Sequence, residues 1–192
     1  MLLLIAGLWL FFGFHSVRLL APEMRANAIG RIGESNWKLV YAGASLTGLI
    51  LIVLGYSDTH HAPIHLWAPP QWTRHVAALM MLPAFVLLAA TYVRPTVLRE
   101  RIGHPMLAGT KLWALAHLLA NGTAGDVVLF GSFLVWAALS FSASRRRDRA
   151  AGVVHPAGKW SRDLVAVVIG AVTWFAFATY LHGLLFGVRP FG

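Results

Sequence analysis

The stretch that decides the fold is residues 103–122, which read GHPMLAGTKLWALAHLLANG. Pro105 suits the first turn of a helix, where its missing N–H is not needed, and Gly122 suits the end of one, because glycine tolerates positive φ. The residues between them form an apolar helix with His117 inside it. Residues spaced by four lie on one helix face. The face predicted to line a ligand pocket consists of Gly109, Trp113, His117 and Asn121.

The composition places this helix in a membrane protein. Of the 192 residues 58% are hydrophobic and only 12% are charged, whereas soluble domains are about 25% charged. The net charge of +9 is divided among basic clusters separated by apolar runs. This pattern is typical of membrane topology, so we expect a lipid bilayer and no nucleic acid as partner. The chain has no cysteine, which excludes thiolate ligands, disulfides and c-type haem attachment.

Six apolar runs are spaced along the chain, and they predict an all-α polytopic bundle of about six membrane-spanning helices in a single domain, 1–192. The first run carries no basic leader and no small-residue cleavage site, so we expect it to be retained as a span. The predicted spans are Leu2–Leu20, Trp37–Gly55, His75–Val93, 103–122, Val127–Ala143 and Leu164–Phe186.

The connecting segments are predicted from their polarity. We expect polar loops at Ala21–Asn36 and Asp58–Arg74, the second lying along the membrane surface because it is rich in proline and tryptophan. The turn at Asn121-Gly122-Thr123 is so short that the helices on either side of it must form an antiparallel hairpin. Asp126, just after this turn, is expected to cap the N-terminus of the next helix in preference to relaying protons.

The distribution of lysine and arginine predicts the orientation. Fourteen of the 16 basic residues fall in the first, third and fifth connections or beside them, and only Arg74 and Arg189 lie on the other side. The positive-inside rule then places both termini outside and these three connections in the cytoplasm. The Arg145–Arg149 run is interpreted as a stop-transfer signal. The fourteen are Arg18, Arg25, Arg31, Lys38, Arg94, Arg99, Arg101, Lys111, Arg145, Arg146, Arg147, Arg149, Lys159 and Arg162.

Three of the nine histidines, His15, His117 and His182, fall within apolar runs. A polar side chain is costly there and usually faces the bundle interior, where a structural hydrogen bond between helices is the simplest role. Two such histidines on different helices, each flanked by aromatic residues, favour joint ligation of a metal. Without cysteine or a nearby carboxylate, a b-type haem is the economical choice. Phe12, Trp113 and Phe130 are candidates to pack around its ring.

His104 is the alternative ligand. Its angular position is about 220° from that of His117, so the two cannot face one pocket on a straight helix. However, in an upright bundle His15 and His117 would differ in depth by about 9 Å, which helix tilt would have to close. If the tilt is too small, His104 becomes the better partner for His15. A cap or a lipid-headgroup contact is the simpler role for His104.

Two motifs identify a relative. Gly13-Phe14-His15-Ser16-Val17-Arg18 and the stretch from His104 to Gly122 resemble the NnrU family, and Leu129-Phe130-Gly131-Ser132-Phe133 continues the similarity over nearly the whole chain. The resemblance implies a multi-pass membrane protein. Bacterial NnrU is linked to nitrite and nitric oxide metabolism in denitrification. A plant relative, 15-cis-zeta-carotene isomerase, is a haem b enzyme.

The resemblance also implies a ligand pair, because the two axial histidines of the isomerase match His15 and His117. The isomerase has a further membrane histidine after the second ligand, and residues Val135–Leu139 here contain none. The leading interpretation that this resemblance implies is a haem b protein of the NnrU type in the bacterial inner membrane, with denitrification enzymes as expected partners. The alternatives are an isomerase acting on a lipid-soluble polyene, or an assembly factor without catalysis.

Overall fold

The computed structural model describes residues 1–191, and the chain folds into α-helices joined by short connections. It divides into two compact units. Unit 1 contains Met1–Leu66 and Thr123–Ser132, and unit 2 contains Trp67–Gly122 and the chain from Phe133. The helices of unit 1 are α1 (Leu2–Leu20), α2 (Pro22–Ile32), α3 (Glu34–Thr59) and the first residues of α7 (Ala124–Ala150).

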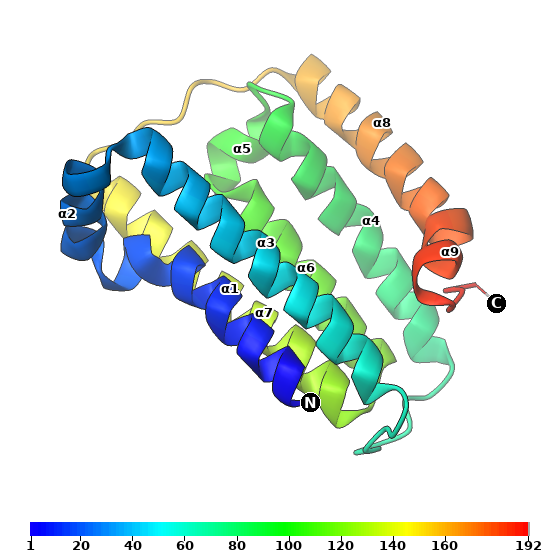
Figure 1. The fold of residues 1–192 in the computed structure, drawn as a ribbon. Helices are drawn as coiled ribbons and strands as arrows, with labels where there is room; N and C mark the ends of the chain where they lie inside the picture. The colour runs from blue at the N-terminus through cyan, green and yellow to red at the C-terminus, as the bar shows by residue number, and fades with distance from the viewer. Residues whose placement is uncertain (192) are drawn as a thin grey trace. The chain divides into compact units, whose positions relative to one another are not determined.

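In unit 1, α1 and α3 lie side by side (Figure 1). Glycine makes the close approach possible: a Cβ added at Gly7 would lie 2.6 Å from the backbone nitrogen of Ile52, and one at Gly55 would overlap the backbone of Leu4. Small residues at helix crossings are typical of membrane proteins, where van der Waals contact drives the association.

The segment Ala21–Asn36, predicted as a polar loop, is mostly helical, so that prediction was wrong. Pro22 begins α2 and Glu23 lies in its first turn, while Gly33 ends it with φ +83°. Each of these residues favours a helix end. The sequence therefore contained the signals for a short polar helix, which its low hydrophobicity obscured.

Unit 2 is built on contacts of α4 with α6 and α8 (Figure 1). A Cβ added at Gly170 of α8 would lie 2.6 Å from the Cα of Val86 in α4, so this contact too depends on glycine. The carboxylate of Asp163 accepts hydrogen bonds from the backbone N–H groups of Val97 (2.9 Å) and Leu98 (3.0 Å), which caps α5. The helices of unit 2 are α4 (Trp72–Tyr92), α5 (Val97–Ile102), α6 (Pro105–Ala120), the rest of α7, α8 (Trp160–Ala176), the π-helix η1 (Phe177–Leu181) and α9 (His182–Phe186).

Within residues 1–191, five helical segments are long and apolar enough to cross a membrane, so the expectation of a polytopic helical membrane protein is confirmed. Their count corrects the predicted six. The helix of the central stretch, α6, has only 16 residues and is about 24 Å long, short of the ~30 Å of bilayer hydrocarbon. The five segments are Leu2–Leu20, Glu34–Thr59, Trp72–Tyr92, Ala124–Ala150 and Trp160–Phe186.

Although it is short, α6 still reverses the chain. Gly122, beyond its C-terminal end, accepts a backbone hydrogen bond from Trp67, which precedes α4, so α6 runs antiparallel to α4. Trp113 contacts Phe133, and His104 contacts Phe141 further along α7. The antiparallel hairpin predicted for α6 and α7 is therefore confirmed, while the orientation in the membrane stays a prediction.

Candidate functional site

On the face of α6 that was predicted to line a pocket, Trp113 and Asn121 both contact His117. The rings of Trp113 and His117 lie 5.3 Å apart, and the Asn121 side-chain N–H donates to the His117 carbonyl at 2.8 Å. Gly109 serves packing, because a Cβ there would lie 3.0 Å from the carbonyl oxygen of Ala84 in α4. The start of this face therefore packs against α4, and its end lies around His117.

A second histidine lies beside His117 within unit 2. The ring centroids of His117 and His182 are 6.4 Å apart and their planes are inclined by only 24°. His182 directly follows the π-helix η1, and its Nδ1–H donates to the Val188 carbonyl at 2.6 Å. π-Helical turns inside helices often occur at functional sites, because they turn the following side chains to a new direction. The apolar runs had drawn attention to His182, but its proximity to His117 is a result of the fold.

His15 lies in unit 1, among aromatic side chains of α1 and α3. Its ring stacks on that of Phe11, with 4.0 Å between centroids and 20° between planes, and the Tyr41 ring lies 5.2 Å away. His15 and His117 are in different units, and each is described within its own unit.

The two histidines share one hydrogen-bonding pattern. Nδ1 of His15 lies 2.8 Å from the Phe11 carbonyl oxygen, and Nδ1 of His117 lies 2.8 Å from the Trp113 carbonyl oxygen. A carbonyl can only accept, so each Nδ1 carries the proton, and in the neutral ring the lone pair is on Nε2. Metal-ligating histidines are held in this way by an acceptor at the other nitrogen.

The same bond occurs outside the apolar runs, and therefore does not identify a ligand by itself. Nδ1 of His60 lies 2.9 Å from the Tyr56 carbonyl oxygen, also four residues earlier, although His60 is exposed at the end of α3. What distinguishes His15 and His117 is their place within hydrophobic helices. No group of three or more His, Asp or Glu side chains in residues 1–191 is arranged to hold a metal ion.

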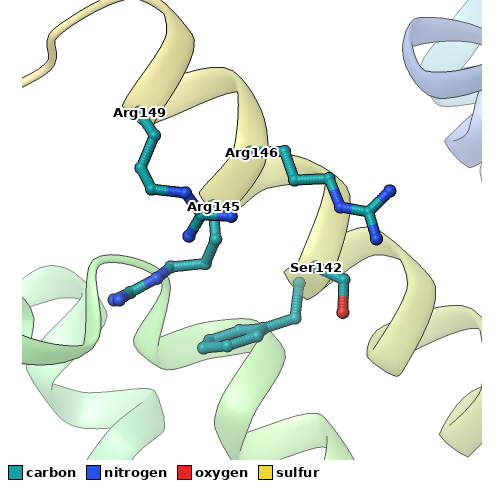
Figure 2. Close-up of a pocket in the computed structure, with 5 residues that line it drawn as sticks. Ser142, Arg145, Arg146 and Arg149 are labelled. Carbon is teal, nitrogen blue, oxygen red and sulfur yellow. The ribbon is translucent and has the colours of Figure 1, made fainter.

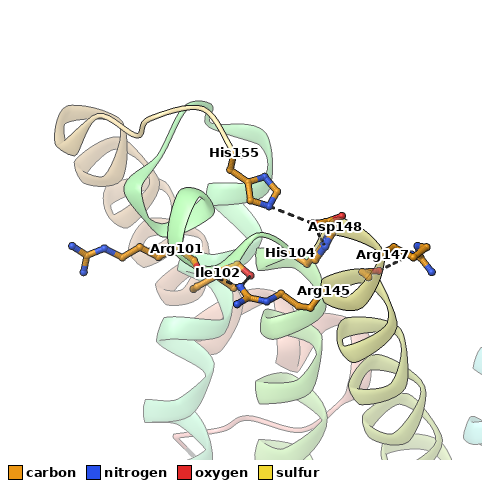
Figure 3. Close-up of polar contacts among 8 residues, drawn as sticks. Arg101, Ile102, His104, Arg145, Arg147, Asp148 and His155 are labelled. Atoms are coloured by element: carbon orange, nitrogen blue, oxygen red, sulfur yellow. Dashed lines mark hydrogen bonds and ion pairs between the residues drawn. The ribbon is translucent and has the colours of Figure 1, made fainter. Parts of the chain in front are cut away.

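His104, the alternative ligand, is in a different environment (Figure 3). Its Nε2 donates to a carboxylate oxygen of Asp148 at 2.9 Å, and Nε2 of His155 lies 3.4 Å from the same oxygen. His104 stands at the N-cap position of α6, but its side chain does not cap the helix. These three residues, named here the His–Asp–His cluster, tie the start of α6, the end of α7 and the following connector together.

Sequence reasoning missed this cluster. Asp148 lies within the arginine run that was interpreted only as a stop-transfer signal, and no role was assigned to His155. Asp148 is the one acid within that run, and this isolated acid was the feature of the sequence that could have indicated the cluster. Its partners His104 and His155 lie 44 and 7 residues away in the sequence, and no periodic pattern links them to Asp148.

Asp126 does cap α7, as predicted. Its carboxylate accepts from the Thr123 backbone N–H at 2.9 Å and from the Thr123 hydroxyl at 2.7 Å, and its own N–H donates to that hydroxyl at 3.3 Å. Such a reciprocal arrangement satisfies N–H groups that the helix leaves unpaired. Tyr56 of α3 donates its hydroxyl to the same carboxylate at 2.6 Å, so this buried acid also joins two helices of unit 1.

Long apolar helices with histidines inside them, and with arginines gathered at their ends, define a polytopic α-helical membrane protein. The chain belongs to the NnrU family: the family model described as NnrU protein matches residues 3–190. No match was found among curated proteins or among solved structures.

Proposed function

We propose that this NnrU-family protein binds haem b through His117 and His15 and serves nitrite and nitric oxide metabolism. Membership of the family supports the metabolic role. The observation that carries the ligand assignment is the place of both histidines inside hydrophobic helices, where a carbonyl four residues earlier holds Nδ1–H and leaves the lone pair on Nε2.

The donor set fits the cofactor. Histidine nitrogen is a common axial ligand of haem iron, and aromatic side chains can pack against an apolar macrocycle. Phe11 stacks on His15, and Trp113 lies 5.3 Å from His117 and 5.2 Å from Phe133. When bound, the haem would supply one-electron chemistry at iron. The carbonyls of Phe11 and Trp113 would hold the two imidazoles in one tautomer.

The test is an absorption spectrum of the purified full chain, oxidised and reduced. We expect the sharp reduced bands of a six-coordinate low-spin haem. His117→Ala and His15→Ala should each reduce the haem content by about tenfold or more, since removing a ligand costs at least as much as removing its support.

His60→Ala is the matched control, because His60 makes the same carbonyl bond on a helix but lies at an exposed end. It should bind haem as the wild type does, and so should His104→Ala. A wild-type protein without haem would overturn the proposal. Haem that is lost in His104→Ala and kept in His117→Ala would instead show that the ligand assignment is wrong.

A further inference from the structure

The C-terminal part of α7 has a hollow of about 300 Å³, lined by Phe141, Ser142, Arg145, Arg146 and Arg149. Figure 2 shows Arg145 and Arg146 next to each other on α7 and Arg149 further along the same helix. None of these five residues was assigned to the proposed haem site.

In the described part of the chain, no ion pair joins the arginines of the hollow to Asp148, the acid of the same run. Asp148 is bound by His104 and His155. Arg145 donates to the carbonyls of Arg101 and Ile102 at the end of α5, so its role is to join α7 to α5. Within residues 1–191 the side chains of Arg146 and Arg149 have no hydrogen bond or ion pair with the protein. These two guanidinium groups are exposed and can take an anion.

The same face of α7 becomes apolar towards the middle of the helix. Val135, Leu139, Ser142, Arg146 and Arg149 are spaced by four, three, four and three residues, so they form one stripe. Val135 is 59% exposed and Leu139 61%. The stripe is about 21 Å long, somewhat more than half the thickness of the bilayer hydrocarbon. It thus presents an apolar track that ends in two arginines.

The hollow itself is lined by both apolar and positively charged side chains. Phe141 provides an aromatic wall, and the Lys111 ammonium of α6 lies 3.8 Å from the centre of its ring. A second helix therefore adds positive charge to the same place, and a ligand here would meet cations beside an apolar surface.

We propose that this stripe, from Val135 to Arg149, binds an anionic phospholipid, with the headgroup phosphate at Arg146 and Arg149 and an acyl chain along Val135 and Leu139. Guanidinium groups match phosphate oxygens in geometry and charge. Basic residues just beyond a membrane span attract anionic lipids of the cytoplasmic leaflet, the side to which the charge distribution assigns this run. A free phosphate would make no use of the apolar track.

The experiment is native mass spectrometry of the full chain, purified in a neutral detergent and supplied with one lipid at a time. Phosphatidylglycerol and phosphatidylcholine with identical acyl chains are the probes. We expect the anionic lipid to be retained about tenfold better, and the Arg146→Gln/Arg149→Gln variant to lose that preference. Arg145 is left intact because it contacts α5.

Arg25→Gln/Arg31→Gln is the matched control, since it removes the same charge from α2 in unit 1 and should keep the preference. Circular dichroism checks that each variant retains its helices. Equal retention of the two lipids by the wild type would overturn the proposal, and so would an Arg146→Gln/Arg149→Gln variant that keeps the preference for the anionic lipid. Displacement of the lipid by excess inorganic phosphate would also overturn it.

Discussion

His117 and His104 lie at opposite ends of the same helix and have different kinds of partner. His117 bonds to a carbonyl of its own helix, four residues earlier. His104 bonds to a carboxylate 44 residues later in the chain. The first contact is local and follows from the position of the histidine within α6. The second exists only because α6 and α7 are antiparallel, which brings the start of one helix to the end of the other.

The difference separates two tasks. A neutral imidazole with its proton held on Nδ1 is prepared to ligate through Nε2. An imidazole whose Nε2 donates to a carboxylate has committed that nitrogen to a structural bond. This comparison supports the proposal that His117 is a ligand, while His104 joins the start of α6 to the end of α7.

Breaking the His–Asp–His cluster should have the largest effect on stability. Asp148→Ala removes the acceptor shared by His104 and His155, and leaves two half-buried imidazoles without it. We expect a loss of about 1–3 kcal/mol in the free energy of unfolding, because a polar group that loses its partner bears its full desolvation cost. Unfolding in SDS, followed by circular dichroism, measures it.

The double-mutant cycle of Asp148→Ala with His104→Ala is the control. The two changes should be less than additive, since each removes the same bond. Additive effects, or a loss of haem in Asp148→Ala with the helices intact, would contradict the division of tasks between His104 and His117.

The sequence was sufficient for the features that depend on local patterns. Apolar runs located the five long helices, and Thr123 with Asp126 has the spacing of a helix cap. The length of α6 was overestimated, because Gly103 and Asn121 were included in a helix that begins at Pro105 and ends at Ala120. α2 was missed because hydrophobicity, the strongest signal in a membrane chain, says little about a polar helix.

The site was predictable only in the same limited sense. The sequence indicated which histidines lie in apolar helices. It did not indicate that His182 lies beside His117 or that Asp148 binds two histidines, because both depend on how separate helices pack. Proximity of this kind is a tertiary property and leaves no periodic trace.

Replacing His182 tests the environment of His117, near the C-terminal end of α6. Its ring lies 6.4 Å from that of His117, so it is the rival of His15 as second ligand. We expect His182→Ala to keep the haem. Its free energy of unfolding should fall by about 1 kcal/mol, because the hydrogen bond to the Val188 carbonyl is lost. Absorption and SDS unfolding measure the two quantities. A haem that is lost in His182→Ala and retained in His15→Ala would place both ligands in unit 2.

The smallest effect is expected from Asn121→Ala. The side-chain N–H of Asn121 donates to the His117 carbonyl at 2.8 Å, at the C-terminal end of α6. This carbonyl also accepts the backbone N–H of Asn121, which the substitution keeps. The loss should therefore be about 0.5 kcal/mol, at the low end of the net value of a hydrogen bond.

The spectrum decides whether Asn121 belongs to the ligand site. The proton of His117 is held by the Trp113 carbonyl and not by Asn121, so the reduced bands of Asn121→Ala should be those of the wild type. Asn121→Asp, which places a carboxylate at the same position, is the companion variant and tests the charge there. A loss of haem in Asn121→Ala, without a matching loss of stability, would show that the amide contacts the cofactor itself and that the site extends one turn beyond His117.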